Sequence, residues 1–250
     1  MKLDKKLFIA LCAISLSQLF TFGSANADSD RANRPLDTIA AGEIKIDVSL
    51  EVPLADGAFF DPISLSPDIY YGINDDLSIG LVHSSASQGL ISAGSSLRLG
   101  GGNSYNNVGF EGQYTFLRQD TFSLAGQAGF YIDDIEPDFN ASIKGGLIAR
   151  THLGPLEATV NPYINLPINN SGPRDNVLSV PVWLYYNIKP RLDVSVVSGV
   201  NDRAFMLGGG VAYDLEGPID LAAHIGWPRL AGRGGAADVL AARLYASINL

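Results

Sequence analysis

Alternation of apolar and polar residues, repeated along most of the chain, limits more than any other feature how this sequence can fold. It is clearest between Asp68 and Ser84, where two alternating runs are separated by the short polar break 74–76. A period of two residues gives a strand two different faces, and a short Asn/Asp break between two such runs marks a hairpin. Because the same unit recurs with variations up to Leu250, the chain is predicted to be all-β.

Twelve such segments are expected between residue 41 and the end of the chain, most of them long enough to cross a membrane. A spanning strand needs about 9 to 11 residues. The connections after every second segment are short and most of the others are longer. This is the outer-membrane pattern, and an even number of strands puts both termini on the short-turn, periplasmic side. The expected segments are 41–52, two within 68–84, 107–116, 121–133, 141–151, 156–165, 176–187, 191–201, 205–214, 219–227 and 239–250.

The two faces of these segments differ in charge. One face carries no charged side chain, although 17% of the chain is charged, so this face is predicted to contact lipid. The opposite face is polar and charged, and Asp68, Asp133 and Asp214 are among its residues. It is predicted to line a lumen, because strands of outer-membrane barrels alternate apolar-out and polar-in. The predicted pore-lining residues are Lys45, Asp47, Glu51, Glu111, Gln113, Lys144, Arg150, Glu157, Arg191, Asp193, Asp220, His224 and Arg243.

Large aromatic residues on the uncharged face avoid the middle of the segments. They lie toward either end, as expected where amphipathic rings prefer the headgroup level of a bilayer. A closed barrel also pairs every backbone N–H and C=O group, which hydrocarbon demands. The predicted fold is therefore a closed antiparallel up-and-down transmembrane β-barrel of about 12 strands. The predicted membrane-interface residues are Tyr71, Phe110, Tyr114, Phe116, Phe122, Phe130, Tyr186, Phe205, Tyr213 and Trp227.

The start of the chain has the three parts of a cleaved signal peptide. Three lysines lie within the first six residues, an apolar run extends from Leu7 to Phe22, and Ala-Asn-Ala at 25–27 is a cleavage signal. Residues 1–27 are therefore expected to be removed. Residues 28–40 are expected to form a polar periplasmic tail, and residues 41–250 the barrel.

Removal of this segment would leave a chain without cysteine chemistry. The only cysteine, Cys12, would be lost, so disulfides and thiolate metal sites are excluded. Loss of three lysines and one aspartate would take the formal net charge from −9 to −11. An acidic exported protein is a poor nucleic-acid binder. No metal or other cofactor is expected.

The chain resembles a Gram-negative outer-membrane β-barrel of the porin-like kind. The hairpin 70–77, which reads YYGINDDL, is similar to periplasmic hairpins of such proteins, and the likeness covers 28–250. It implies insertion in the outer membrane, contact with lipid and lipopolysaccharide, and folding by the barrel-assembly machinery. The chain departs from the pattern at its end, because such barrels usually finish on an aromatic residue and this one finishes on Leu250. The oligomeric state is left open.

The expected lumen favours a narrow passive channel for small polar solutes or ions. Eight strands leave an interior filled by side chains and sixteen leave an aqueous channel, so a barrel of about twelve lies between. The inward face is rich in Gly, Ser, Ala and Asn, and its carboxylates outnumber its cations. A weak preference for cations is therefore expected. A structural or adhesive barrel that acts through its surface loops is an alternative.

A second alternative is an enzyme. His83 and Ser85 share the outer face at the end of a segment, and this arrangement resembles outer-membrane acyl hydrolases, in which histidine activates a serine nucleophile. The sequence offers no convincing third residue to orient the histidine, so no catalytic residue is assigned. The stretch Asp133–Asp138 contains carboxylates that suit Ca²⁺. Its spacing matches no known binding loop, and a solvated acidic loop is expected.

Overall fold

A computed structural model describes residues 39–54, 63–83, 97–99, 108–134, 140–169, 178–201, 204–215, 217–232 and 240–250. In this part of the chain, no helix has the length and apolar character needed to cross a membrane. The regular elements are β1 (Ile44–Pro53), β2 (Ile63–Asn74), β3 (Leu77–Val82), β4 (Leu97–Leu99), β5 (Val108–Gln119), β6 (Phe122–Asp134), β7 (Asn140–Leu153), β8 (Leu156–Val160), β9 (Tyr163–Pro167), β10 (Leu178–Lys189), β11 (Leu192–Asn201), β12 (Ala204–Asp214), β13 (Ile219–Gly232) and β14 (Ala241–Asn249).

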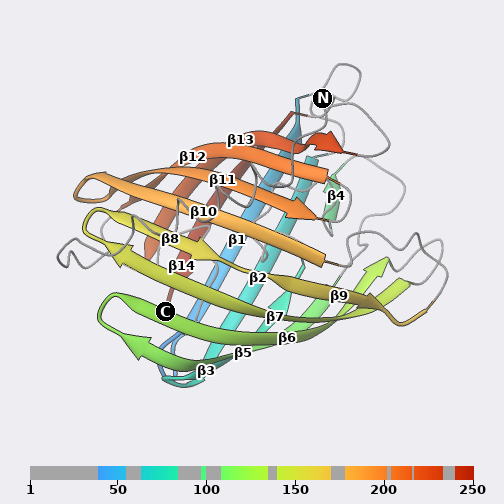
Figure 1. Cartoon of the computed structure of the whole chain (residues 1–250), viewed down its shortest axis with the longest axis horizontal. Helices are drawn as coiled ribbons and strands as arrows, with labels where there is room; N and C mark the ends of the chain where they lie inside the picture. The colour runs from blue at the N-terminus through green and yellow to red at the C-terminus, as the bar shows by residue number, and fades with distance from the viewer. Residues whose placement is uncertain are drawn as a thin grey trace, which may run out of the picture.

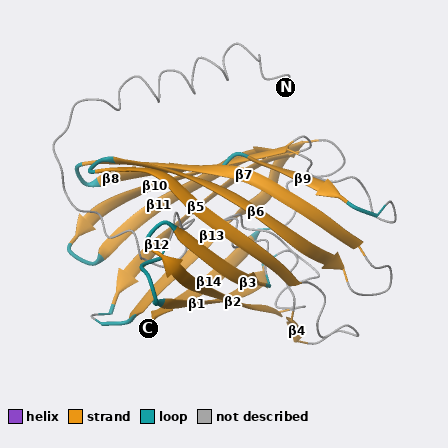
Figure 2. Ribbon diagram, turned by 90° about the horizontal axis from the view of Figure 1, so that it is seen from below, coloured by secondary structure: helices purple, strands orange, loops and turns teal. Residues whose placement is uncertain are grey.

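The strands form one antiparallel sheet that closes on itself (Figures 1 and 2). Most strands pair with the strand that follows them in sequence. The ring is completed by β1, which pairs with β2 on one side and with β14 on the other. The result is a closed barrel of 12 strands with one extra strand, β4, paired to the start of β2. The predicted fold class and strand number are confirmed.

One of the barrel strands is interrupted by a proline without losing its register. Pro162 separates β8 from β9, and the two occupy the same place between β7 and β10. Val182 pairs with Val160, and Ser179 pairs with Tyr163, so no residue is inserted between the two halves. Because proline lacks a backbone donor, a ladder bond is lost there. The two short elements together are the single segment expected over 156–165.

Burial follows the two-residue period of the sequence. In β14 the exposed fraction alternates from 0% at Arg243 to 52% at Leu244 and 7% at Tyr245. In β5, Phe110 and Tyr114 are exposed, whereas Glu111 and Gln113, the residues next to them, are buried. The uncharged face is thus the outer surface of the barrel, and the charged face is the inner one.

Short turns gather at one end of the barrel, where the described ends of the chain also lie. The backbones of Ile44 and Leu250 bond each other in both directions, with N···O distances of 2.9 and 2.8 Å. The Ala41 N–H donates to the Asp75 carboxylate in the turn between β2 and β3, at 3.2 Å. The turns β5–β6, β7–β8 and β10–β11 are each two residues long, between the ends of their strands. Longer connections lie mostly at the other end.

The residues that lead into β1 lie against the inner face of β2. Ile39 is only 4% exposed and belongs to a buried apolar cluster with Tyr70. A Cβ atom added to Gly72 would lie 2.0 Å from the carbonyl oxygen of Ala40, so the close approach requires glycine. Of the last two residues of the expected tail, Ile39 is therefore packed inside the barrel, whereas the side chain of Ala40 is exposed.

Candidate functional site in the barrel lumen

The structure brings nearly all of the predicted pore-lining residues to the inner face. Asp47 is half-buried there, and Lys45 and Glu51 on the same strand are buried. Asp68 is buried and Asp214 half-buried on the same face, whereas the side chain of Asp133 lies outside the described residues. The buried members of the predicted set are Lys45, Glu51, Glu111, Gln113, Lys144, Arg150, Glu157, Asp193, Asp220, His224 and Arg243.

Arg191 corrects the predicted set. It lies in the turn between β10 and β11 rather than in a strand, and its side chain is exposed. Its φ of +78° is in the left-handed region, which suits a tight turn and cannot continue a strand. The segment expected over 191–201 starts one residue too early, since β11 begins at Leu192.

The predicted interface aromatics lie on the outer face. Phe122 and Phe205 are half-buried, and the others are exposed. Among the exposed aromatic side chains, the exposed fraction runs from 38% at Trp227 to 55% at Phe110. Their placement at the two edges of a bilayer stays a prediction.

A buried ion pair joins β1 to β14. The Arg243 guanidinium lies 3.2 Å from the Glu51 carboxylate, and both side chains are at most 5% exposed. Arg243 also donates to the Tyr245 hydroxyl at 3.3 Å. The His224 ring meets the Tyr245 ring edge-on, with centroids 5.7 Å apart. These four side chains form one polar network on the inner wall.

Two aspartates face each other across β1 and β2. Asp47 and Asp68 are register partners on the inner face. Asp47 accepts a hydrogen bond from the Ser247 hydroxyl and lies 4.0 Å from the Lys45 ammonium. Asp68 accepts a bond of 2.5 Å from the backbone N–H of His83. The neighbouring carboxylates are thus each held by a donor, and they concentrate negative charge at this wall.

His83 is placed differently from the expectation that linked it to Ser85. It is 8% exposed, and its ring nitrogen contacts the carbonyl oxygen of Pro67. Ser85 lies outside the described residues. The structure therefore supplies nothing that supports the hydrolase alternative.

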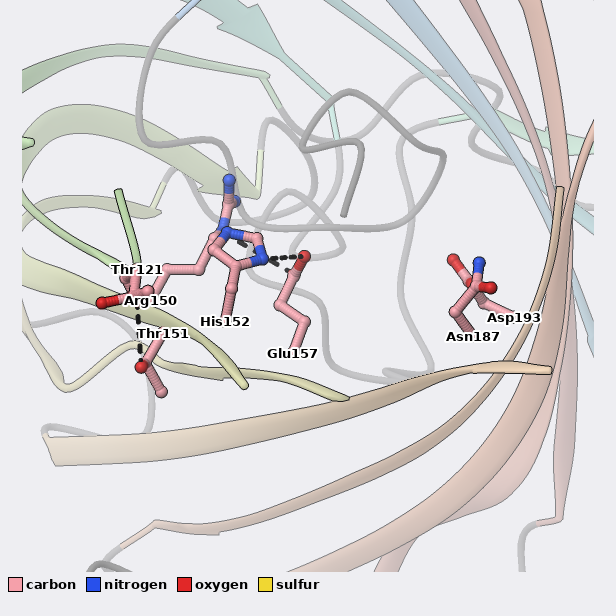
Figure 3. Close-up of polar contacts among 7 residues, drawn as sticks. All are labelled: Thr121, Arg150, Thr151, His152, Glu157, Asn187 and Asp193. Carbon is pink, nitrogen blue, oxygen red and sulfur yellow. Dashed lines mark hydrogen bonds and ion pairs between the residues drawn. The ribbon is translucent and has the colours of Figure 1, made fainter. Parts of the chain in front are cut away.

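A second charged cluster lies near the short turns on β7 and β8 (Figure 3). Arg150 Nε lies 3.7 Å from one oxygen of Glu157, and His152 Nδ1 lies 3.6 Å from the other. Farther along the wall, Asn187 donates to Asp193 at 2.8 Å. The inner charges are therefore held in local groups rather than spread evenly.

A row of charged and aromatic side chains crosses β5, β6, β7 and β9. The Tyr131 hydroxyl donates to Glu111, and the Lys144 ammonium lies 5.8 Å from the centre of the Tyr131 ring. The same ammonium lies 4.5 Å from the Tyr163 ring on the other side. Such distances allow cation–π attraction.

The inward tyrosines pack against glycines on adjacent strands, a feature that the sequence analysis did not predict. A Cβ at Gly109 would lie 2.3 Å from the Tyr131 ring, and one at Gly80 would lie 2.5 Å from the Tyr70 ring. A Cβ at Gly146 would lie 2.6 Å from the Cβ atom of Tyr163 rather than from its ring. Each of these glycines is the register partner of its tyrosine. The signal in the sequence is a tyrosine opposite a glycine once the register is known.

The inner wall is polar and acidic. Its described side chains include four cations, on β1, β7 and β14, and eight carboxylates. Among the described residues, no group of three or more His, Cys, Asp or Glu could hold a metal ion. The side chains of the acidic stretch Asp133–Asp138, considered for Ca²⁺, lie outside the part of the chain that the structure describes. The wall can bind polar groups and bias the passage of ions by charge.

Comparison with known proteins gives a fold and no family. No protein-family model matches the chain, and no curated protein matches it. Among solved structures, the chain is similar to a KdgM porin in complex with disordered oligogalacturonate, with a TM-score of 0.56 and 9% identity over 82% of this chain and 98% of that one. It is also similar to the COG4313 outer membrane channel from Pseudomonas putida F1, with a TM-score of 0.53 and 13% identity over 91% of this chain and 100% of that one. At these identities the likeness concerns the fold alone, and the fold is that of an outer-membrane β-barrel.

Proposed function

We propose that the protein is an outer-membrane barrel that forms a narrow passive channel for small polar solutes or ions. The observation that carries this proposal is the division of the barrel wall, which is uncharged outside and charged inside. A charged inner face has no use in a barrel filled by an apolar core, since buried charges cost free energy unless they are paired or solvated. In a channel, such a face tunes which ions pass.

The passage is narrow. Trp183 on β10 and Arg243 on β14 are each 0% exposed, and Tyr185 is 1% exposed. Side chains that lined a wide aqueous channel would keep more contact with solvent. A twelve-stranded barrel lies between the small barrels that side chains fill and the large ones that enclose water. We therefore expect a small conductance and exclusion of large solutes.

The ion preference tests the proposed channel. The refolded protein in a planar bilayer should conduct with a mild preference for cations, because carboxylates outnumber cations on the inner wall. Asp47→Asn should reduce this preference, since it removes one lumen charge but leaves an amide that Ser247 can still bond. The measurement is the reversal potential across a salt gradient.

The control for this change is Asp120→Asn, an exposed position in the turn between β5 and β6. It should leave the reversal potential unchanged. High salt should weaken the preference through screening. A preference for anions, or equal effects of the two variants, would contradict the charge argument.

We also propose that the chain is exported with cleavage after Ala27, is assembled by the barrel-assembly machinery among lipid and lipopolysaccharide, and has both termini in the periplasm. The gathering of the short turns and both described ends at one end of the barrel supports this orientation. A single cysteine at Ser104, in the connection between β4 and β5, should react with an impermeant maleimide in intact cells. One at Gln119, beside a short turn, should react only after lysis. Labelling of Gln119→Cys in intact cells would invert the orientation.

A further inference from the structure

We infer that Lys144, with Tyr131, Tyr163 and Ser142 around it, forms a subsite for the carboxylate group of a small solute in the lumen. This inference rests on the proposed channel and names a class of solute for it. The four residues lie on the inner face of β6, β7 and β9. They are each at most 8% exposed.

The ammonium group of Lys144 has donors without acceptors. Its Nζ is buried and makes no hydrogen bond to any described residue. An ammonium carries three N–H donors, and an unpaired buried charge is costly. The other described lumen cations differ, because Arg243, Arg150 and Lys45 each have a carboxylate oxygen within 3.2, 3.7 and 4.0 Å respectively. Among the described cations of the inner wall, Lys144 is therefore the one whose donors are left for an incoming anion.

The surroundings of Lys144 hold its charge without satisfying its donors. The Tyr163 and Tyr131 rings lie 4.5 and 5.8 Å away and attract the ammonium through their faces. The Tyr131 hydroxyl is already engaged by Glu111, which also attracts Lys144 electrostatically. The rings thus place the ammonium group and leave its N–H bonds free to point at a ligand.

The subsite is built on a rigid frame. A Cβ at Gly146 would lie 2.6 Å from the Cβ atom of Tyr163, and one at Gly129 would lie 2.9 Å from the Tyr131 ring, so both tyrosines pack closely against glycine positions. Gly129 is also the register partner of Lys144, so the position next to the lysine carries no side chain of its own. Fixed rings reduce the entropy that binding must offset, which is the advantage of a preorganised site.

The ligand that fits is a monocarboxylate. One cation supplies one charge, and the nearby Glu111 would repel a second negative charge on the solute. Ser142 lies two residues from Lys144 on the same face, and its buried hydroxyl also lacks a partner. An ammonium and a hydroxyl on the same face of one strand offer donors to the two oxygens of one carboxylate. A phosphate dianion fits this set poorly.

The test measures binding of trifluoroacetate to the full chain folded in non-ionic detergent, by the ¹⁹F relaxation of the probe. The wild-type protein should broaden the probe signal in a saturable way relative to empty micelles. Lys144→Gln should raise the apparent Kd by about tenfold or more, since hydrogen bonds to charged groups are among the stronger ones. Lys144→Arg should keep most of the binding, and Lys144→Met gives a second neutral variant.

The controls separate charge recognition from general attraction. Trifluoroacetamide, the neutral analogue, should bind no differently to wild type and Lys144→Gln. Lys189→Gln, an exposed lysine at the end of β10, should bind trifluoroacetate like wild type. Equal affinity of wild type and Lys144→Gln for trifluoroacetate overturns the subsite, as does equal loss in Lys189→Gln.

Channel recordings on the same proteins separate this inference from the proposed function. Conductance without Lys144-dependent binding refutes the subsite and keeps the channel. Lys144-dependent binding without any conductance refutes the channel and keeps the lumen site. Saturation of trifluoroacetate current in wild type, with less saturation in Lys144→Gln, supports both.

Discussion

Replacing Arg243 with glutamine should lower the free energy of unfolding by ~3–5 kcal/mol, the usual cost of leaving one partner of a buried ion pair uncompensated. The partner is Glu51, whose carboxylate lies 3.2 Å from the guanidinium at a position shielded from solvent. The same change also removes the bond from Arg243 to the Tyr245 hydroxyl. Denaturant unfolding of the protein refolded into lipid vesicles measures the effect.

The double variant Glu51→Gln/Arg243→Gln is the matched control. It removes both charges, so it should recover most of the stability lost in the single variant. Arg118→Gln should cost much less, because Arg118 is exposed and its bond of 3.0 Å goes to the neutral carbonyl oxygen of Asp75. A single variant as stable as the double would mean that water enters the lumen at Glu51 and solvates it.

Replacing Leu244 with lysine should lower the free energy of unfolding by ~2–4 kcal/mol, because the charge would enter lipid near the middle of the bilayer. Leu244 lies in the middle of β14 and is 52% exposed on the outer face. Its register partners are Leu50 and Ala223, so the patch around it is apolar. Vesicle unfolding titrations again give the value.

Gln113→Lys is the comparison on the inner face. Gln113 is 4% exposed and donates to Glu111 at 3.3 Å, so a lysine there has a carboxylate beside it. It should cost clearly less than Leu244→Lys. Equal costs at the two positions would contradict the assignment of one face to lipid and the other to a polar lumen.

The sequence is informative about the barrel because alternation is a local property. Each pair of neighbouring residues indicates which side chain points to lipid and which to the lumen. The run from Leu244 to Leu250 alternates in polarity in the sequence much as it alternates in burial in the structure. The ends of strands are less predictable, since they depend on pairing. β13 continues to Gly232 because Ala204 and Phe205 of β12 pair with its last residues. The residues of β13 itself did not predict this extension beyond residue 227.

The organisation of the lumen could not be predicted in the same way. Its contacts join residues far apart in sequence, such as Glu51 with Arg243, and they become visible only when β1 closes onto β14. The structure also distinguishes Lys144, whose ammonium makes no hydrogen bond to a described residue, from Lys45, whose ammonium lies 4.0 Å from Asp47 on the same strand. The alternation of the sequence predicts that both lysines point inward and that Asp47 shares a face with Lys45. It does not show which side chains of other strands surround Lys144.

The most direct test of the account is a single-channel recording of the refolded protein. Discrete small current steps are expected from the wild type. Trp183→Ala should enlarge the steps, because Trp183 is the largest fully buried inward side chain among the described residues. Trp227→Ala, a change on the outer face, should leave them unchanged. A correctly folded protein that inserts into the bilayer and shows no current steps, with or without Trp183, would contradict a channel through this barrel.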